Sequence, residues 1–333
     1  MRSLPTILIS TFGSKKSGLG HVSRDAELAK LLQPEARIFF HTRSNEKICG
    51  LIMARVQARI FRGSLADAIK KSAANLLIVD RPYDIGRVEE LCGVDNLKII
   101  AFDYFYYDDG RIDIAINLLN HYIDRAKKIK IKKIYSGLKY AIIRSDVLRL
   151  RSRQGITSKS VRRVFICFGG ADPNNNTLQA LRLLGHLKVK RAKFDVVIGP
   201  VFRHISKIKE AGSRLFKKRI TLYKNPLNFA SLMARADVVI CGGGVTLMEA
   251  LCLGKPTTVM PQKNEINFIL KKGISKAVLL LPQELSDEEK YKRMGDLLVN
   301  SRYRSKLVKI SKKLIDGKGK ERIKGIILGK RND

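Results

Sequence analysis

The chain of 333 residues, 45% of them hydrophobic, is long enough for two domains and too apolar to be disordered. No apolar run reaches the roughly 20 residues of a membrane-spanning helix, and the opening MRSLPTILIS lacks the apolar core and cleavage site of a signal peptide, so we expect a cytoplasmic protein. The net charge of +35 favours an anionic partner (nucleic acid, an anionic membrane face or a phosphorylated substrate), although a lysine-rich bias spread over solvated faces would give the same number.

The first half alternates apolar strands with helices. Val22–Leu32 carries its apolar residues at helical spacing. Several of the expected strands end in a polar residue, such as Asp80, Asp103 or Asn117, which is typical of the ligand-binding carboxyl edge of an open parallel sheet. The expected strands are Thr6–Ser10, Ala36–His41, Leu76–Val79, Lys98–Phe102 and Ile112–Ile116.

A polar stretch without periodicity, Arg151–Ser160, separates the two halves. We therefore expect one domain over residues 1–150 and a second over residues 151–333, the second ending in a basic helical segment that either folds back across the first domain or extends to a partner. The second half repeats the pattern, with strands at Val164–Phe168, Phe194–Ile198, Ile220–Tyr223, Val238–Cys241 and Thr257–Met260. Two similar halves predict an α/β fold of two Rossmann-like domains that face each other across a cleft.

The first candidate site follows the first strand, where Gly18-Leu19-Gly20-His21 opens a helix. Glycines let the backbone approach a ligand, and a helix start presents unpaired N–H groups. The motif is not the dinucleotide fingerprint, because His41 stands where an acidic residue would end the second strand. His21 is either a general base in a cleft or a histidine that caps or packs at a turn.

Two further strands open into glycines. Gly169 and Gly170 precede a helix for which Asp172 or Asn174 is a natural cap. Gly242-Gly243-Gly244 begins a helix whose N-terminus can bind a diphosphate, and Glu249 on that helix can accept hydrogen bonds from ribose hydroxyls. Alternatively, Glu249 has no ligand and only stabilises the helix, as an acidic residue near a helix N-terminus does.

The five cysteines are scattered and show no metal-binding spacing, which suits free thiols in a reducing compartment. We expect no metal site and no cofactor.

The glycine-rich string from Ala236 to Ala250, followed by Gly254-Lys255-Pro256, resembles the nucleotide-binding half of GT-B glycosyltransferases, such as the peptidoglycan N-acetylglucosaminyltransferase. A wider resemblance, to the UDP-sugar hydrolases of pseudaminic-acid biosynthesis and their spore-coat polysaccharide relatives, runs in order from about Gly18 to Asn264. Its segments are Gly18–Arg24 (G-x-G-H-x-x-R), Ile78–Asp80, Ile116–Asn117, Ser136–Arg144 (G-x-x-Y-A-x-x-R), Phe168–Pro173 and Gly243–Glu249.

This resemblance implies a hydrolase that releases UDP from a UDP-linked diacetamido-trideoxy sugar, by attack of water at the anomeric carbon, in nonulosonic-acid or surface-polysaccharide biosynthesis. His21 matches the general base and Asn264 an asparagine near the sugar. The implied nucleotide site comprises Gly169, Gly170, Gly243, Gly244, Thr246 and Glu249, and the implied sugar site Gly20, Arg24, Asp80 and Tyr104. A neutral histidine can take a proton near pH 7, and a helix N-terminus can stabilise departing UDP without a metal.

Two alternatives stay open. A GT-B glycosyltransferase would move the sugar from UDP to a lipid-linked or polymeric acceptor, and its basic residues would favour peripheral binding to the inner membrane face or to a polyanion. A non-catalytic or nucleic-acid-binding protein fits less well, because the chain has no Trp, only 7% aromatic residues and no recognised nucleic-acid module, so we expect no specific nucleic-acid partner.

Overall fold

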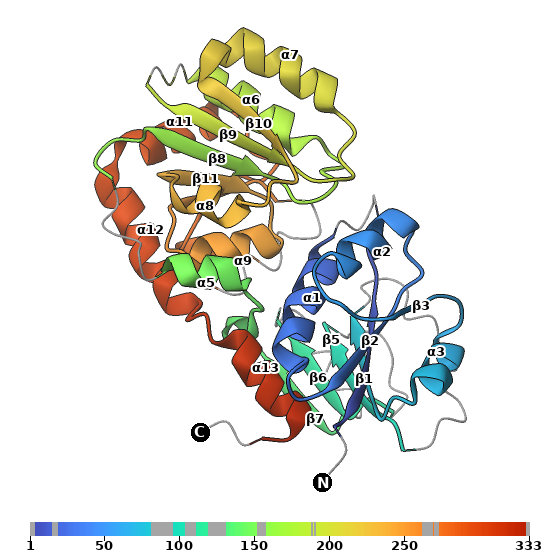
Figure 1. Cartoon of the computed structure of the whole chain (residues 1–333). Helices are drawn as coiled ribbons and strands as arrows, with labels where there is room; N and C mark the ends of the chain where they lie inside the picture. Colours follow the sequence, from blue (N-terminus) through green and yellow to red (C-terminus); the bar gives the residue numbers. More distant parts are fainter. Residues whose placement is uncertain are drawn as a thin grey trace. The chain divides into compact units, whose positions relative to one another are not determined.

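The computed structural model describes residues 4–14, 19–80, 96–103, 111–118, 131–151, 158–187, 189, 191–261, 269 and 273–330. Contacts divide the chain into two compact units (Figure 1). Unit 1 contains Met1–Ser14, Leu19–Ile142 and Lys318–Asp333, and unit 2 contains Ile143–Gly317. The chain therefore leaves unit 1 after residue 142 and returns to it for its last helix.

The described part of unit 1 contains a parallel seven-stranded sheet with the order β3-β2-β1-β4-β5-β6-β7. Side chains of β1 alternate between the two faces, so Ile7 and Ile9 enter one apolar cluster and Leu8 enters the other. Both faces are thus buried, as expected for parallel strands. The strands are β1 Thr6–Thr11, β2 Arg37–His41, β3 Ile60–Phe61, β4 Leu76–Asp80, β5 Lys98–Phe102, β6 Ile114–Asn117 and β7 Lys133–Ser136.

The helices of unit 1 start at residues that suit a helix N-terminus. Asn45 and Ser64 accept backbone hydrogen bonds at the starts of α2 and α3. The helices are α1 Gly20–Leu32, α2 Glu46–Met53, α3 Leu65–Ser72, the short 3₁₀ helix η3 Leu138–Tyr140 and α13 Gly319–Leu328.

The last helix, α13, packs on unit 1 and contacts α1 and η3 (Figure 1). Ile323, Ile326 and Ile327 join the same apolar cluster as Ile7 and Ile9. Glu35, just after α1, pairs with Lys324 at 2.6 Å and also with Lys330, and these lysines lower the pKa of Glu35 to about 2. Of the two arrangements expected for the C-terminal segment, α13 thus follows the one that folds back on the first domain.

Unit 2 repeats the architecture. Its described residues form a parallel sheet with the order β10-β9-β8-β11-β12-β13. The strands are β8 Arg163–Cys167, β9 Lys193–Ile198, β10 Ile220–Lys224, β11 Val238–Cys241, β12 Thr257–Val259 and β13 Leu279–Leu280.

The helices of unit 2 cover this sheet and extend toward the C-terminus. Arg304 is fully buried on α12 and donates hydrogen bonds to the carbonyl groups of Leu297, Leu298, Ser158 and Lys159, so it ties the start of this unit to its end. The helices are α5 Ser145–Arg151, α6 Asn176–His186, α7 Ile205–Phe216, η4 Lys217–Arg219, α8 Phe229–Ala234, α9 Val245–Cys252, η5 Ile274–Lys276, α11 Asp287–Val299 and α12 Ser301–Leu314.

The predicted strands are confirmed, with ends that shift by one or two residues. The strands absent from the prediction are β3 and β13, which have two residues each, and β7, an edge strand. Among the helices that the structure describes, none combines the length and apolar character needed to cross a lipid bilayer.

Candidate functional site

His21 lies at the start of α1, directly after the turn that follows β1. Its Nδ1 atom is 2.7 Å from Oδ1 of Asp80, the last residue of β4. The Asp80 side chain is buried, whereas the His21 side chain is 20% exposed. The same Nδ1 atom lies 3.2 Å from Nη2 of Arg24. The contact with Asp80 is a hydrogen bond when Nδ1 carries a proton, and in that tautomer of the neutral ring the lone pair is on Nε2.

Arg24, one turn further along α1, holds the same carboxylate. Its Nε atom lies 2.6 Å from Oδ2 of Asp80 and its Nη2 atom 2.5 Å from Oδ1, while Nη1 lies 2.8 Å from Oδ2 of Asp103. Burial opposes ionisation of Asp80, but the charge of Arg24 and the contact with His21 outweigh it and hold the pKa of Asp80 well below its usual range. Asp80 is therefore a carboxylate engaged by side chains of its own unit, which favours orientation of His21 over direct contact with a sugar.

The topology of the sheet explains why these residues meet. Strand β1 leads to β2 and β3 on one side, and β4 continues the sheet on the other, so the strand order reverses between β1 and β4. Ligands of open α/β sheets bind at such a switch point, beyond the carboxyl ends of the strands. Thr11 and Asp80 are paired at the ends of these two strands, and α1 begins beside them.

The glycine-rich segments of unit 2 lie at the corresponding reversal, between β8 and β11. Cys167 and Cys241 are paired at the ends of these strands, and Gly169-Gly170 and Gly242-Gly243-Gly244 follow them. The Cys167 thiol interacts with the Gly169 amide and the Thr246 hydroxyl, and burial raises its pKa to about 11. The two predicted nucleotide motifs are thus brought together.

The start of α9 has two features that favour binding of an anion. Gly244 is its N-cap, provides no side-chain capping bond, and would have open space around an added Cβ. The first N–H groups of a helix lack intrahelical partners and carry a partial positive charge. Gly170 in the neighbouring loop packs so closely on Gly199 that a Cβ on Gly199 would lie 2.3 Å from the Gly170 Cα, so this loop is fixed by backbone packing.

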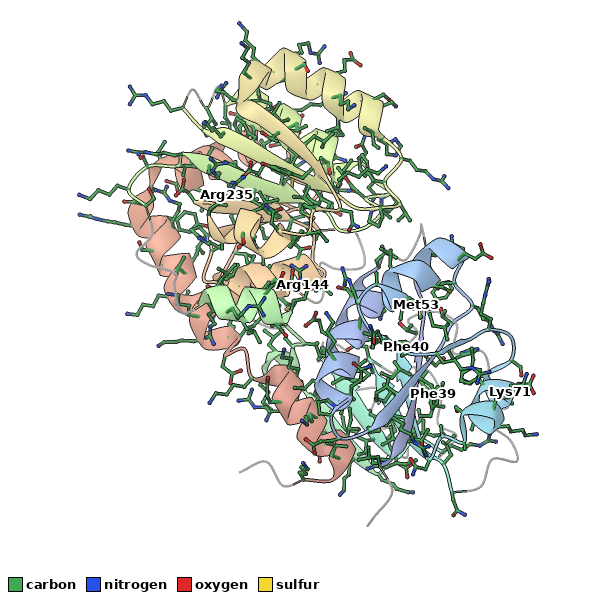
Figure 2. The ribbon with its side chains drawn as sticks, viewed as in Figure 1. Phe39, Phe40, Met53, Lys71, Arg144 and Arg235 are labelled. Atoms are coloured by element: carbon green, nitrogen blue, oxygen red, sulfur yellow. The ribbon has the colours of Figure 1, made fainter. Side chains whose placement is uncertain are left out.

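Glu249, one turn into α9, is only 2% exposed. Its Oε1 atom accepts a hydrogen bond from Nε of Arg144 at 2.7 Å, and the Arg144 guanidinium lies 4.5 Å from the ring centre of Phe229. Figure 2 shows Arg144 beside α9. In the sequence, Arg144 and Glu249 belong to separate motifs. Neither motif predicts that the two side chains form an ion pair.

Asp172 takes the structural role that the sequence offered for it. Its carboxylate accepts hydrogen bonds from the Asn176 and Thr177 amides at 2.8 and 2.9 Å and from the Thr177 hydroxyl at 2.6 Å. It therefore caps α6 at a buried position and rigidifies the loop that carries Gly169 and Gly170.

Three of the predicted positions, Gly18, Tyr104 and Asn264, lie outside the described residues. In the described segments, no group of three or more histidine, cysteine, aspartate or glutamate side chains could hold a metal ion.

Comparisons with known proteins agree with this architecture. No protein-family model matches the chain. Among solved structures, a glycosyltransferase from Rickettsia africae has a TM-score of 0.66 at 13% identity and covers 98% of this chain and 99% of its own. The Staphylococcus aureus MnaA–UDP co-structure has a TM-score of 0.67 at 13% identity and covers 99% and 100%. The chain consists of two parallel-sheet α/β domains, the architecture of GT-B glycosyltransferases.

Two curated relatives align with the chain at the level of sequence. MJ1062, an uncharacterized protein from Methanocaldococcus jannaschii, is 30% identical over 285 residues, which are 78% of this chain and 56% of that protein. The chain therefore spans little more than half the length of this relative. The spore coat polysaccharide biosynthesis protein SpsG from Bacillus subtilis is 24% identical over 338 residues, 95% of each chain.

Proposed function

We propose that this protein is a glycosyltransferase that moves a sugar from a UDP-sugar to an acceptor hydroxyl in polysaccharide biosynthesis. The observation that carries the proposal is the contact between His21 and Asp80 at the switch point of unit 1. Asp80 keeps the proton on Nδ1, so Nε2 of His21 can remove a proton from an attacking O–H group.

In this proposal, unit 2 binds the UDP leaving group. The start of α9 accepts the diphosphate, and its N–H groups stabilise the charge that develops on UDP as the anomeric C–O bond breaks. The nucleotide residues are Gly169, Gly170, Gly243, Gly244 and Thr246, with Glu249 as the acceptor for the ribose hydroxyls. The UDP bound to MnaA and the polysaccharide role in the name of SpsG support this choice of substrate class.

Hydrolysis is the second candidate, because the same base can activate water. The observation that favours it is the placement of His21 immediately after Gly20 at the start of α1, the arrangement expected from the resemblance to UDP-sugar hydrolases. The two reactions share the base, the leaving group and the nucleotide site, and they differ only in whether the attacking oxygen belongs to water or to a sugar.

The basic composition supports an acceptor at an anionic surface. A net charge of +35 attracts the chain to anionic lipid headgroups and to polyanionic polymers. We expect binding to vesicles of phosphatidylglycerol that weakens with added salt, and no binding to phosphatidylcholine vesicles.

UDP release from a panel of UDP-amino sugars tests the proposal, with and without lipid-linked and polymeric acceptors. A transferase releases UDP only with its acceptor, whereas a hydrolase releases UDP alone. In either case His21→Ala should lower the rate by about 10²- to 10⁴-fold while UDP binding is retained. His186→Ala, at an exposed histidine that stacks on Tyr291 in unit 2, is the matched control and should leave the rate unchanged. A His21→Ala variant with full activity would refute the assignment of the base.

A further inference from the structure

Asp25 is a buried carboxyl group beside the proposed base that the mechanism so far does not use. His21, Arg24 and Asp25 occupy positions i, i+3 and i+4 of α1, so they share one face of the helix. That face lies against the ends of β1 and β4, and the groups that act on the Asp25 side chain are Asp80, Arg24 and the Thr11 hydroxyl. Asp25 is 0% exposed.

The charges around Asp25 do not balance if all the carboxyl groups are ionised. Arg24 is the buried cation of the cluster, and its three guanidinium nitrogens bond to Asp80 and Asp103. Within the described segments, neither oxygen of Asp25 makes a hydrogen bond of good geometry, and the neighbouring Thr11 hydroxyl, the neutral group that acts on Asp25, makes none either. An ionised carboxylate without a cation or a donor is very costly to bury, so the group takes up a proton instead.

Burial and the neighbouring Asp80 both favour the protonated form of Asp25. Burial raises the pKa of Asp25 well above its usual range, and the negative charge of Asp80 adds to this effect, while Arg24 and Thr11 oppose it. A neutral carboxylic acid differs from a carboxylate because it has an O–H group to donate. The ionised oxygens of Asp80 are the strongest acceptors beside it.

We propose that Asp25 is a neutral carboxylic acid that donates its O–H group to Asp80, and that it is a positioning residue for His21. This inference rests on the proposed function. The Asp80 carboxylate then accepts a hydrogen bond from Asp25 in addition to its contacts with Arg24 and His21. The donated proton stays on Asp25, so no proton transfer is involved; its role is to fix the carboxylate that orients the imidazole.

The ionisation state can be measured without any substrate. The experiment is ¹³C NMR of the full chain labelled at the aspartate carboxyl carbons, recorded between pH 5 and 9. We expect one signal that stays in the range of a protonated acid at pH 7, is absent in Asp25→Asn, and persists in Asp67→Asn, an exposed aspartate of α3. Survival in Asp25→Asn of every protonated signal seen in the wild type, or the lack of any such signal in the wild type, would overturn the proposal.

The positioning role has its own readout. The ¹⁵N shifts of the His21 ring report which nitrogen carries the proton. We expect Asp25→Ala to lose the single Nδ1–H tautomer and to lower kcat by about 10- to 100-fold with UDP affinity unchanged. Asp25→Asn, which restores an N–H donor, should recover the tautomer and most of the rate. Equal behaviour of the two variants would refute the role.

The two proposals can fail separately. If the wild type turns over no UDP-sugar, the proposed function fails, but the carboxyl and imidazole signals still decide the state and the role of Asp25. If Asp25→Ala does not fold, the carboxyl spectra of the wild type, Asp25→Asn and Asp67→Asn still decide whether Asp25 is protonated. The His21 tautomer in Asp25→Asn then tests the positioning role: it must match the wild type, and a change would refute that role.

Discussion

The Nε atom of Arg144 lies 2.7 Å from Oε1 of Glu249, although the two residues are 105 positions apart in the chain. Arg144 precedes α5 and Glu249 lies on α9, so this ion pair fixes the helix whose N-terminus is the candidate phosphate site. Because Glu249 is buried, the pair couples the stability of unit 2 to the geometry of the candidate nucleotide site.

A double-mutant cycle measures this coupling. Arg144→Met removes the cation that pairs with the buried Glu249 carboxylate and should destabilise the protein by about 3–5 kcal/mol. Glu249→Gln removes that charge, so the double variant should be more stable than the sum of the two single effects predicts. Urea denaturation gives the free energies of unfolding. Arg293→Met, which breaks an exposed pair with Glu289 on α11, is the control and should change stability little. Strict additivity at Arg144 and Glu249 would contradict this prediction.

Protonation of Asp80 at low pH should lower the stability of the folded protein. The pKa of Asp80 is lowered in the folded state, so its ionised form contributes stability above the usual carboxyl range, and this contribution is lost as the pH falls toward the folded-state pKa. Asp80→Asn lacks this component. Its deficit relative to the wild type should therefore be largest near pH 7 and should shrink below about pH 4. Thermal unfolding from pH 3 to 7 measures the difference, and a deficit that stays constant with pH would argue against it.

Gly199 should not tolerate a side chain. An added Cβ would lie 2.3 Å from the Gly170 Cα and 2.4 Å from its carbonyl oxygen, and backbone atoms cannot move aside as a flexible side chain can. We expect Gly199→Ala to displace the Gly170 loop and to weaken UDP binding, measured by calorimetry. Gly50→Ala, within α2 and with no atom near its added Cβ, should be neutral or stabilise by up to about 1 kcal/mol.

Cys167 should be unreactive despite its place between the two nucleotide motifs. Burial raises its pKa to about 11, so the thiolate that reacts with alkylating agents is scarce at neutral pH. Among Cys49, Cys167, Cys241 and Cys252, the half-buried Cys49 should react first with iodoacetamide in the native protein. Mass spectrometry of timed digests measures the order, and early modification of Cys167 would show that this loop opens.

The sequence predicts the α/β class and most strands, because a buried parallel strand is an apolar run that ends at a polar residue. The signal fails at β3 and β13, which are too short for any periodicity, and at the edge strand β7, where half of the residues are exposed. The sequence also does not predict where α13 packs. The apolar stripe formed by Ile323, Ile326 and Ile327 indicates that one face of the helix is buried, but it does not indicate which unit covers that face.

The candidate site was predictable residue by residue but not as a network. Glycines beside His21, and Asp80 at a strand end, point to a site, and the switch-point rule follows once the strand order is known. The Arg24 contacts with Asp80 and Asp103 depend on tertiary structure. Asp25 has no pattern that separates it from an ordinary helix-surface aspartate, and only its burial distinguishes it.

The return of α13 to unit 1 makes the second half of this protein an insertion within the first. Residues 143–317 of unit 2 form one continuous segment, and residues of unit 1 both precede and follow it. The two parts of unit 1 meet beside this segment: a Cβ on Gly319 would lie 2.2 Å from the Ala141 carbonyl oxygen. A truncation after residue 142 would therefore remove α13 and expose the apolar surface of unit 1 that Ile323, Ile326 and Ile327 cover.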